Sequence, residues 1–341
     1  LPDVFGFSAA LPQILRQAGV DTFLTQKLSW SQFNRFPHHT FRWRGIDGSG
    51  VLAHFLPEGN YNSQLAPDRR RHSAENFEER GFLPEFLSLF GIGDGGGGPS
   101  DEHIEYGKRQ ADLAGCPHVQ FGAAQPLLDR LLEHWDDLPV WRGELYLELH
   151  RGTLTTHARN KRMNRQLEHR LRLTEMLWSC LPIEQYPADI LEPCWKRMLT
   201  NQFHDIIPGS SIQSVYEDSR ADYEKRFEAL DTLDTEAVRQ MGGGELGKSG
   251  EVTLFNPLSH TVTTALRLPK AKGTTLELDS GVELPVQATA DGAGWICTEL
   301  GPLEVVHGKI ATESTSERPA DNAPCAVHAT ERGLENDLVR Y

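Results

Sequence analysis

The chain has 341 residues, a formal net charge of −14, and 7 Trp and 15 Phe residues. At roughly 100–200 residues per domain, this length predicts two or three domains. The aromatic residues need hydrophobic cores, which excludes a disordered chain. The negative charge excludes a nucleic-acid partner, because non-specific binding to nucleic acid needs a surplus of lysine and arginine. No run of about 18 apolar residues occurs, so we expect no transmembrane helix and no membrane partner.

The first 158 residues alternate between helical and strand-like patterns. Short apolar runs predict buried strands at 20–24 and 51–56, and apolar residues at helical spacing predict helices over 9–18 and 125–135. Short strands between helices indicate βα units, so we expect an α/β domain over 1–158. Within it, the basic run at 69–72 is interpreted as a solvated loop, and the glycine-rich stretch IGDGGGG at 92–98 is expected to lack regular structure.

The pattern changes after residue 158. Three long stretches with helical periodicity, at 159–179, 187–203 and 211–240, predict a helical bundle over 159–241. The glycine-rich segment 242–250 is expected to be a linker. Short strands separated by Gly and Pro turns then predict the start of a β-sandwich over 251–341, with a polar loop at 311–324.

The five cysteines are far apart and form no CxxC pair. Their odd number and low density argue against a disulfide framework and favour a reducing compartment. We therefore expect a cytoplasmic location.

Three polar sites stand out as candidates for chemistry. Asp3 follows a proline and precedes a glycine turn and a helix, a position where α/β folds gather functional groups and where Asp also serves simply as a cap. His204 and Asp205 follow the second long helix; a neutral His is a common metal ligand, although a His–Asp pair also suits a helix end.

The third site is the segment WRGELYLELH at 141–150. Glu144, Glu148 and His150 alternate, so a strand would place them on one face, which either is solvated or lines a polar cleft. A glycosidase needs two carboxylates on either side of a sugar bond. Asp3 and Glu144 are candidates for such a pair, although their distance in space cannot be read from the sequence.

Aromatic residues in the first section allow two interpretations. Trp30, Phe41, Trp43 and Tyr61 are either core residues, which we favour, or platforms on which a sugar ring stacks.

Together these segments resemble glycoside hydrolase family 38, the α-mannosidases, and most of all its bacterial and cytosolic branch. The strings that carry the resemblance occur in family order: PDVFGFSAALPQIL at 2–15, TQKLSWSQFNRFPHHTF at 25–41, GDGGGGP at 93–99, GELYLELHRGTLTTHARNKRMNR at 143–165, NQFHDIIPGSSI at 201–212 and LFNPLSH at 254–260. The resemblance implies part of a seven-stranded, barrel-like α/β catalytic domain, a three-helix bundle and the start of a β-sandwich.

The resemblance also implies roles for individual residues. Asp3 would be both the catalytic nucleophile and a metal ligand, His204 a second metal ligand, and Asp205 a contact for substrate hydroxyls. Glu144 would be the acid/base. Asp94 is a rival for that role or a substrate contact, and Lys27 would be the basic residue near the nucleophile.

The family is zinc-dependent, with cobalt as the alternative metal. Its remaining two metal ligands come from a His-x-Asp segment near the N-terminus, and no such segment precedes Asp3 here. We therefore expect an internal piece of a longer mannosidase that by itself binds no metal and is inactive, because Asp3 and His204 are too few for a catalytic zinc site.

The leading hypothesis is a metal-dependent retaining α-mannosidase that acts on terminal α-mannosidic bonds of mannosides or oligosaccharides. Two alternatives stay open: another metal-dependent carbohydrate hydrolase such as a deacetylase, and a catalytically inactive carbohydrate-binding or assembly module. A homo-oligomer is compatible with the sequence.

Overall fold

The computed structural model describes residues 1–94, 96–241, 250–268, 273–311, 328–330 and 333–335. The chain divides into two compact units: residues 1–161 with 201–217, and residues 162–200 with 218–341. Residues 242–249 of the predicted linker and 312–324 of the predicted polar loop lie outside the described residues. Among the described residues, no helix is both long enough and apolar enough to cross a membrane.

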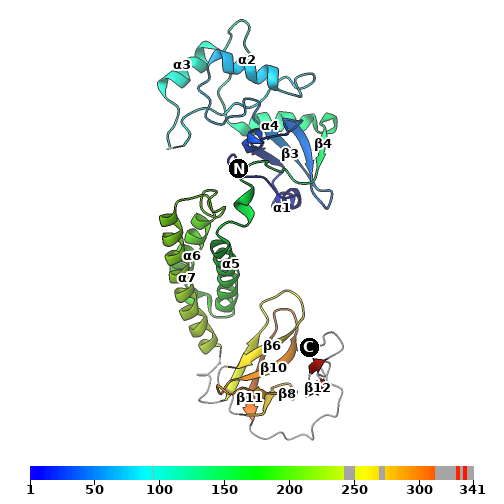
Figure 1. Ribbon diagram of the computed structural model, residues 1–341, viewed down its shortest axis with the longest axis vertical. Helices are drawn as coiled ribbons and strands as arrows, with labels where there is room; N and C mark the ends of the chain where they lie inside the picture. The colour runs from blue at the N-terminus through cyan, green and yellow to red at the C-terminus, as the bar shows by residue number, and fades with distance from the viewer. Residues whose placement is uncertain (95, 242–249, 269–272, 312–327, 331–332, 336–341) are drawn as a thin grey trace. The chain divides into compact units, whose positions relative to one another are not determined.

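The first unit is built on a mixed four-stranded sheet in the order β1-β3-β2-β4 (Figure 1). β1 is parallel to β3, β3 is antiparallel to β2, and β2 is parallel to β4. This arrangement confirms the α/β class of the first section. The elements are α1 (Leu11–Gln17), β1 (Thr22–Thr25), η1 (Lys27–Trp30), β2 (Thr40–Arg44), β3 (Gly50–Phe55), α2 (Pro67–Asn76), α3 (Asp101–Arg109), α4 (Ala124–Glu133), η2 (Trp135–Asp137), β4 (Val140–Arg142) and η3 (Arg151–Leu154).

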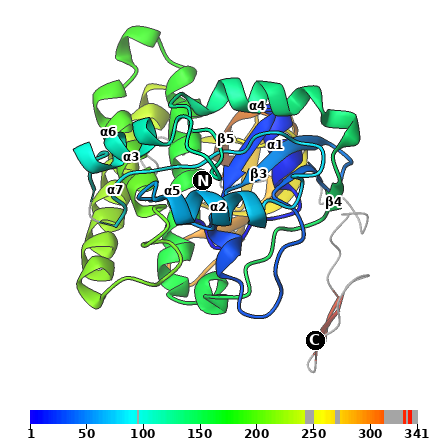
Figure 2. The ribbon, with the colours of Figure 1, turned by 90° about the horizontal axis from the view of Figure 1, so that it is seen from above.

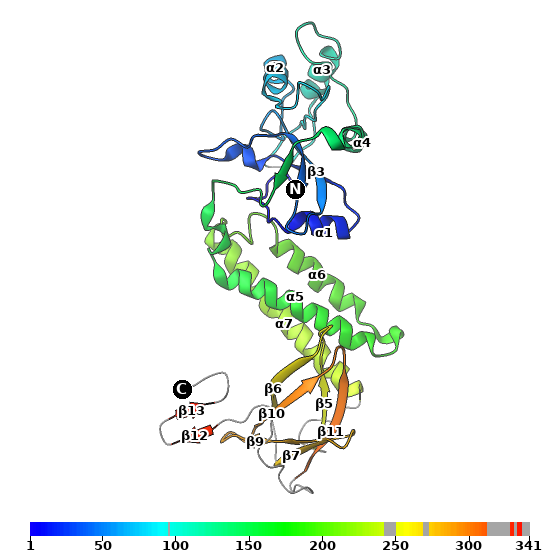
Figure 3. The ribbon, with the colours of Figure 1, turned by 90° about the vertical axis from the view of Figure 1, so that its right-hand side faces the viewer.

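Helices cover both faces of this sheet, and β3 lies between α1 and α4 (Figure 3). Val51, Ala53 and Phe55 pack into the core on the α1 side, whereas Leu52 packs against leucines of α4 on the other. α4 runs alongside the strands (Figure 2). Because β3 is buried on both faces, its sequence is apolar except at His54, which is why it was predicted as a buried strand.

The predicted loop at 69–72 is wrong, although three of its four residues, all except Arg70, are exposed as expected. These residues belong to α2, which has a proline in its first turn. Arg70 is only 3% exposed and forms an ion pair with Glu58, which is 4% exposed. Arg70 also donates a hydrogen bond to the Ser63 hydroxyl. A buried arginine is tolerated here because its charge is paired and hydrogen-bonded.

Three long helices follow, α5 (Ala158–Ser179), α6 (Ala188–Asn201) and α7 (Gln213–Gln240). Each end of the predicted helices is confirmed to within two residues. Their apolar residues recur three, four or seven positions apart and so lie on one face of each helix. These faces share one core, made of Leu167, Leu171, Leu177, Trp178, Leu191, Cys194, Met198, Tyr223, Leu230, Leu233 and Ala237.

The C-terminal section consists of antiparallel sheets. One has the order β6-β10-β9 and another β5-β11-β7-β8, and both contribute apolar side chains to one core. Burial alternates along β10, as expected for a strand with one face in a core. The bounds are β5 (Glu251–Phe255), β6 (Val262–Leu268), β7 (Thr275–Leu278), β8 (Glu283–Pro285), β9 (Gln287–Ala288), β10 (Gly294–Leu300), β11 (Val305–Ala311), and the hairpin strands β12 (His328–Thr330) and β13 (Gly333–Glu335).

Candidate active site

Asp3 lies in a loop that is anchored to the end of the sheet. Phe7 and Leu145 exchange two backbone hydrogen bonds of 2.8 and 2.9 Å. Between them and Asp3, Gly6 has a φ of +100°, and a Cβ there would lie 3.1 Å from the Leu145 carbonyl oxygen. A side chain at this position would therefore be both strained and crowded. The glycine allows the chain to turn so that Asp3 sits beside β1 and η1.

Two side chains hold the Asp3 carboxylate. The Lys27 ammonium lies 2.6 Å from Oδ1, and the Tyr61 hydroxyl lies 3.2 Å from Oδ2. Burial acts to raise the pKa of Asp3, but the hydrogen bond and charge of Lys27, followed by Tyr61 and His204, lower it overall. Asp3 is therefore held as a carboxylate, the form that a nucleophile or a metal ligand requires.

His204 is carried by an irregular segment between α6 and α7, which is tied to its own unit. The Tyr216 hydroxyl donates to the Ile206 carbonyl, and the Ser211 hydroxyl donates to the Asp205 carbonyl. Gly209, at φ +87°, packs so closely against Thr156 that a Cβ would come within 2.8 Å of it. These contacts fix the backbone that follows His204.

This segment brings the imidazole of His204 to Asp3. Its Nε2 lies 3.4 Å from Asp3 Oδ2 and 3.7 Å from Asp205 Oδ2. The ring also packs edge-on against Phe5, with centroids 6.4 Å apart. The first and second candidate sites of the sequence therefore form one cluster.

The pKa of Tyr61 is affected by two further carboxylates besides that of Asp3. Burial, then the charge and hydrogen bond of Asp3, and then the charges of Asp94 and Asp205, raise the pKa of Tyr61 to about 12. Asp94 is exposed and has a positive φ of 38°. Asp94 and Asp205 thus act electrostatically on the same hydroxyl that contacts Asp3.

Glu144 is placed differently from the expectation. β4 ends at Arg142, and Gly143 has a φ of +107°, so Glu144, Glu148 and His150 do not lie along a strand. The Glu144 side chain is exposed, and no hydrogen bond or ion pair joins it to the Asp3 cluster in the described part of the chain. Glu148 instead accepts hydrogen bonds from Phe33 and Asn34.

The aromatic residues divide between the two interpretations. Phe41 and Trp43 are fully buried in the core beneath the sheet. Trp30 is 51% exposed, and the Lys27 ammonium lies 3.7 Å from the centroid of its ring. Tyr61, which we favoured as a core residue, contacts Asp3; its position in the polar stretch EGNYNSQ, outside any apolar pattern, was the signal against a core role.

Comparisons with known proteins identify the family of this chain. The sequence model of the glycosyl hydrolases family 38 N-terminal domain matches residues 1–144, and that of the alpha mannosidase middle domain matches residues 148–241. The chain belongs to glycosyl hydrolase family 38. The first match contains Asp3, Lys27, Tyr61 and Asp94, and the second contains His204 and Asp205.

Individual proteins support the membership. This family 38 chain is 41% identical over 277 residues to human alpha-mannosidase 2C1, an alignment that covers 80% of this chain and 26% of the human protein. It is 48% identical over 220 residues to alpha-mannosidase G of Dictyostelium discoideum, covering 64% of this chain and 20% of that protein. The chain thus matches about a quarter or less of the length of these relatives.

A solved structure shares the fold. A crystal structure of an alpha-mannosidase from Enterococcus faecalis V583 superposes with a TM-score of 0.64 at 17% identity, covering 100% of this chain and 46% of that one.

The separation of Asp3 and His204 can be compared with that of two ligands on one zinc ion. Two ligands about 2.1 Å from a tetrahedral ion lie roughly 3.4 Å apart, and Asp3 Oδ2 and His204 Nε2 are separated by 3.4 Å. Carboxylate oxygen and imidazole nitrogen are both suitable donors. In the part of the chain that the structure describes, no group of three or more His, Cys, Asp or Glu side chains is arranged to hold a metal ion. The residues therefore fit two positions of a coordination shell.

Proposed function

We propose that the protein containing this chain is a metal-dependent retaining α-mannosidase that hydrolyses terminal α-mannosidic bonds. The observation that supports this most is the cluster in which Asp3 is contacted by Lys27, Tyr61 and His204. Family membership and the names of the similar proteins point to mannosides as substrates. The seven-stranded catalytic domain, the boundaries at 158, 241 and 250, and a cytoplasmic location remain predictions.

In the first step, Asp3 attacks the anomeric carbon while the bond from that carbon to the leaving oxygen breaks. The Lys27 ammonium, 2.6 Å from Oδ1, keeps Asp3 ionised until the attack. A carboxylic acid gives its proton to the leaving oxygen, and a covalent glycosyl-enzyme forms. In the second step the same group, now a carboxylate, takes a proton from water, which attacks the anomeric carbon and releases Asp3.

We infer that Asp94 is a better candidate for this acid/base than Glu144. The charge of Asp94 acts on Tyr61, whose hydroxyl contacts Asp3, so Asp94 and Asp3 share one neighbourhood. Glu144 has no corresponding link to the cluster among the described residues. Asp94 is exposed, so a substrate can reach its carboxylate.

Zinc would be held here by Asp3 and His204, and when bound it would supply a Lewis acid for the sugar hydroxyls. Asp205 Oδ2 lies 3.7 Å from His204 Nε2, and its side chain is 59% exposed, as a residue that hydrogen-bonds substrate hydroxyls must be. Phe5, which packs on His204, provides an apolar surface beside these polar groups.

The test is hydrolysis of p-nitrophenyl α-mannoside by the complete protein, with the first sugar product followed by NMR. Retention predicts that α-mannose appears first and only later equilibrates with the β anomer. Initial β-mannose would contradict the covalent intermediate, and the absence of hydrolysis by metal-loaded protein would contradict the assigned activity.

A further inference from the structure

Lys27 and Trp30 are the first and last residues of the single 3₁₀ turn η1. Because a 3₁₀ turn contains three residues, side chains three positions apart lie one above the other. The Lys27 ammonium accordingly lies 3.7 Å from the centroid of the Trp30 ring. A cation within about 6 Å of an aromatic centroid is attracted by the negative face of the ring. The backbone of η1 therefore brings the lysine and the tryptophan into contact.

The turn is held in place by its own neighbours. The Gln26 carbonyl accepts a hydrogen bond of 2.9 Å from the Ser29 N–H, and the Gln26 side chain accepts one of 2.8 Å from the Ser29 hydroxyl. Leu28, which is 2% exposed, packs into the core on the α1 side of the sheet. These contacts fix the turn that carries both Lys27 and Trp30.

The Lys27 ammonium is surrounded by one carboxylate and two aromatic rings. Its side chain is only 7% exposed, and Asp3 Oδ1, at 2.6 Å, is its one ion-pair partner among the described residues. Besides Trp30, the ring of Phe5 lies 5.5 Å from the ammonium. A buried ammonium loses much of its hydration, so the attraction of an aromatic face contributes more here than at an exposed site.

This attraction gains importance once Asp3 has reacted. In the covalent intermediate Asp3 is an ester and no longer carries a negative charge. Within the described part of the chain, Lys27 then has no anionic partner, whereas the faces of Trp30 and Phe5 are unchanged. The rings therefore keep the ammonium beside Asp3 in both steps of the reaction.

We propose that Trp30 is a positioning residue for the nucleophile, because its ring holds the Lys27 ammonium against Asp3 Oδ1. This inference rests on the proposed function. It gives Trp30 neither of the roles considered from the sequence. The ring is 51% exposed and so is no core residue, and the face that contacts Lys27 is not available to a sugar.

Steady-state kinetics of the complete protein on p-nitrophenyl α-mannoside separate a positioning residue from a sugar platform. Trp30→Ala should lower kcat about 10- to 30-fold, as expected for the loss of a buried cation–π contact, and should change KM by less than about twofold. Trp30→Phe keeps an aromatic face and should recover most of kcat. A raised KM with unchanged kcat would make Trp30 a substrate platform, and equal kcat values of the Phe and Ala variants would exclude a role for the aromatic face.

Fluorinated tryptophan tests the contact without changing the packing. Fluorine atoms withdraw electron density from the indole face and weaken its attraction for a cation. With fluorinated tryptophan placed at position 30 alone, log kcat should fall steadily as fluorine atoms are added. The same residues at position 135 are the control, because Trp135 contacts Arg42, at 5.9 Å, rather than the Asp3 cluster. If kcat did not depend on fluorination at position 30, the proposal would be overturned.

Fluorine NMR separates failure of this proposal from failure of the assigned activity. With 5-fluorotryptophan at position 30 of the complete protein, Lys27→Met should move the fluorine resonance, and the resonance of the same label at position 135 should stay in place. Asp3→Asn, which removes the charge of Asp3 as the ester does, should leave the resonance at position 30 closer to wild type than Lys27→Met does. An unchanged resonance in Lys27→Met would overturn the proposal. A moved resonance in a protein that hydrolyses no mannoside would instead contradict the proposed function.

Discussion

The Nε2 atom of His204 lies 3.4 Å from Oδ2 of Asp3. Asp3 comes from the first loop of the chain, and His204 from the segment after α6. Both belong to the same compact unit, because residues 201–217 pack with residues 1–161. The candidate active site therefore depends on a chain that leaves the first unit and returns to it.

The first prediction concerns the nucleophile. Asp3→Ala should reduce kcat for p-nitrophenyl α-mannoside by about 10⁴-fold or more, as expected when the residue that forms the covalent intermediate is lost. Thermal unfolding of the variant serves as the control for folding. Near wild-type turnover in a folded variant would remove Asp3 from the catalytic role.

A second prediction distinguishes Asp94 from Glu144 as the acid/base. An activated leaving group such as 2,4-dinitrophenolate needs no proton, whereas a sugar alcohol does. We expect Asp94→Ala to lose about 10²–10⁴-fold in kcat/KM on mannobiose while losing much less on 2,4-dinitrophenyl α-mannoside. Glu144→Ala should affect both substrates little. The opposite result would restore the assignment made from the sequence resemblance.

The metal prediction can be checked without an activity assay. If Asp3 and His204 share a zinc ion, His204→Ala should weaken zinc binding by at least about 100-fold in a chelator competition, since even outer-shell changes cost 10–100-fold. His72→Ala, which changes an exposed histidine of α2, is the matched control. Unchanged zinc affinity in His204→Ala would contradict this ligand assignment.

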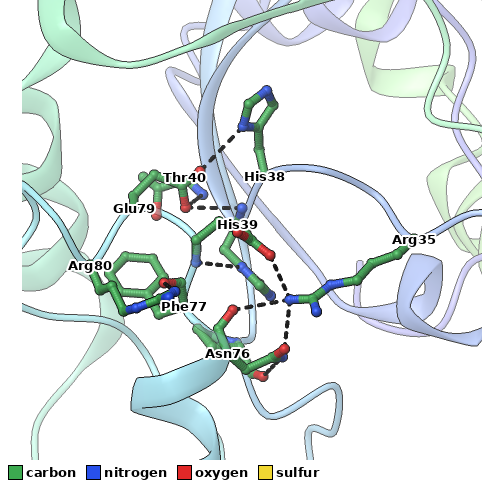
Figure 4. A network of polar contacts seen from close by, with 10 residues as sticks. Arg35, His38, His39, Thr40, Asn76, Phe77, Glu79 and Arg80 are labelled. Carbon is green, nitrogen blue, oxygen red and sulfur yellow. Dashed lines mark hydrogen bonds and ion pairs between the residues drawn. The ribbon is translucent and has the colours of Figure 1, made fainter.

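Two buried histidines, His39 (Figure 4) and His54, predict that the free energy of unfolding depends on pH. Burial lowers the pKa of His39 to about 4 and that of His54 to about 3. Both rings are also used in their neutral form: His39 Nδ1 accepts from the Glu78 backbone N–H and His54 Nε2 from that of Leu87. A proton on either nitrogen would remove an acceptor.

In the unfolded chain both rings titrate near 6.5, so between that pH and the folded values the unfolded state binds more protons. The free energy of unfolding should thus fall as the pH falls below about 6.5, by about 2 kcal/mol per histidine between pH 8 and pH 5. Urea unfolding at the two pH values measures this. His54→Gln should flatten the dependence and His118→Gln, an exposed control, should not; equal slopes in all three proteins would contradict the explanation.

Loss of the buried ion pair between Arg70 and Glu58 should lower the free energy of unfolding. Arg70→Ala leaves the Glu58 carboxylate buried and unpaired, which costs about 3–5 kcal/mol. The neighbouring Arg69 is exposed, so Arg69→Ala should change stability by less than about 0.5 kcal/mol. Chemical denaturation of the two variants compares them directly, and similar stabilities would mean that the pair carries no net stabilisation.

Some elements were predictable because the spacing of their apolar residues along the sequence indicates which residues are buried. The helices α5 and α6 repeat many of their apolar residues three or four positions apart, and β3 is an apolar run broken only by His54. β2 was missed although Phe41 and Trp43 alternate with polar residues in the pattern of a strand. α2 offered no such pattern, because its sequence PDRRRHSAEN is almost entirely polar. Its buried arginine depends on a partner outside the helix.

The sequence by itself determined the family and singled out Asp3, His204 and Asp205 as candidate site residues, because these lie in long, specific strings. It also determined the order of the α/β, helical and β sections, since amphipathic periodicity is a local property. Only the tertiary structure decided that Asp3, Lys27, Tyr61 and His204 meet. It also decided that Glu144 has, among the described residues, no hydrogen bond or ion pair with this cluster, and that Glu148 accepts hydrogen bonds from the backbone of Phe33 and Asn34. Such contacts join segments far apart in the chain, and no local pattern of residues encodes their distances.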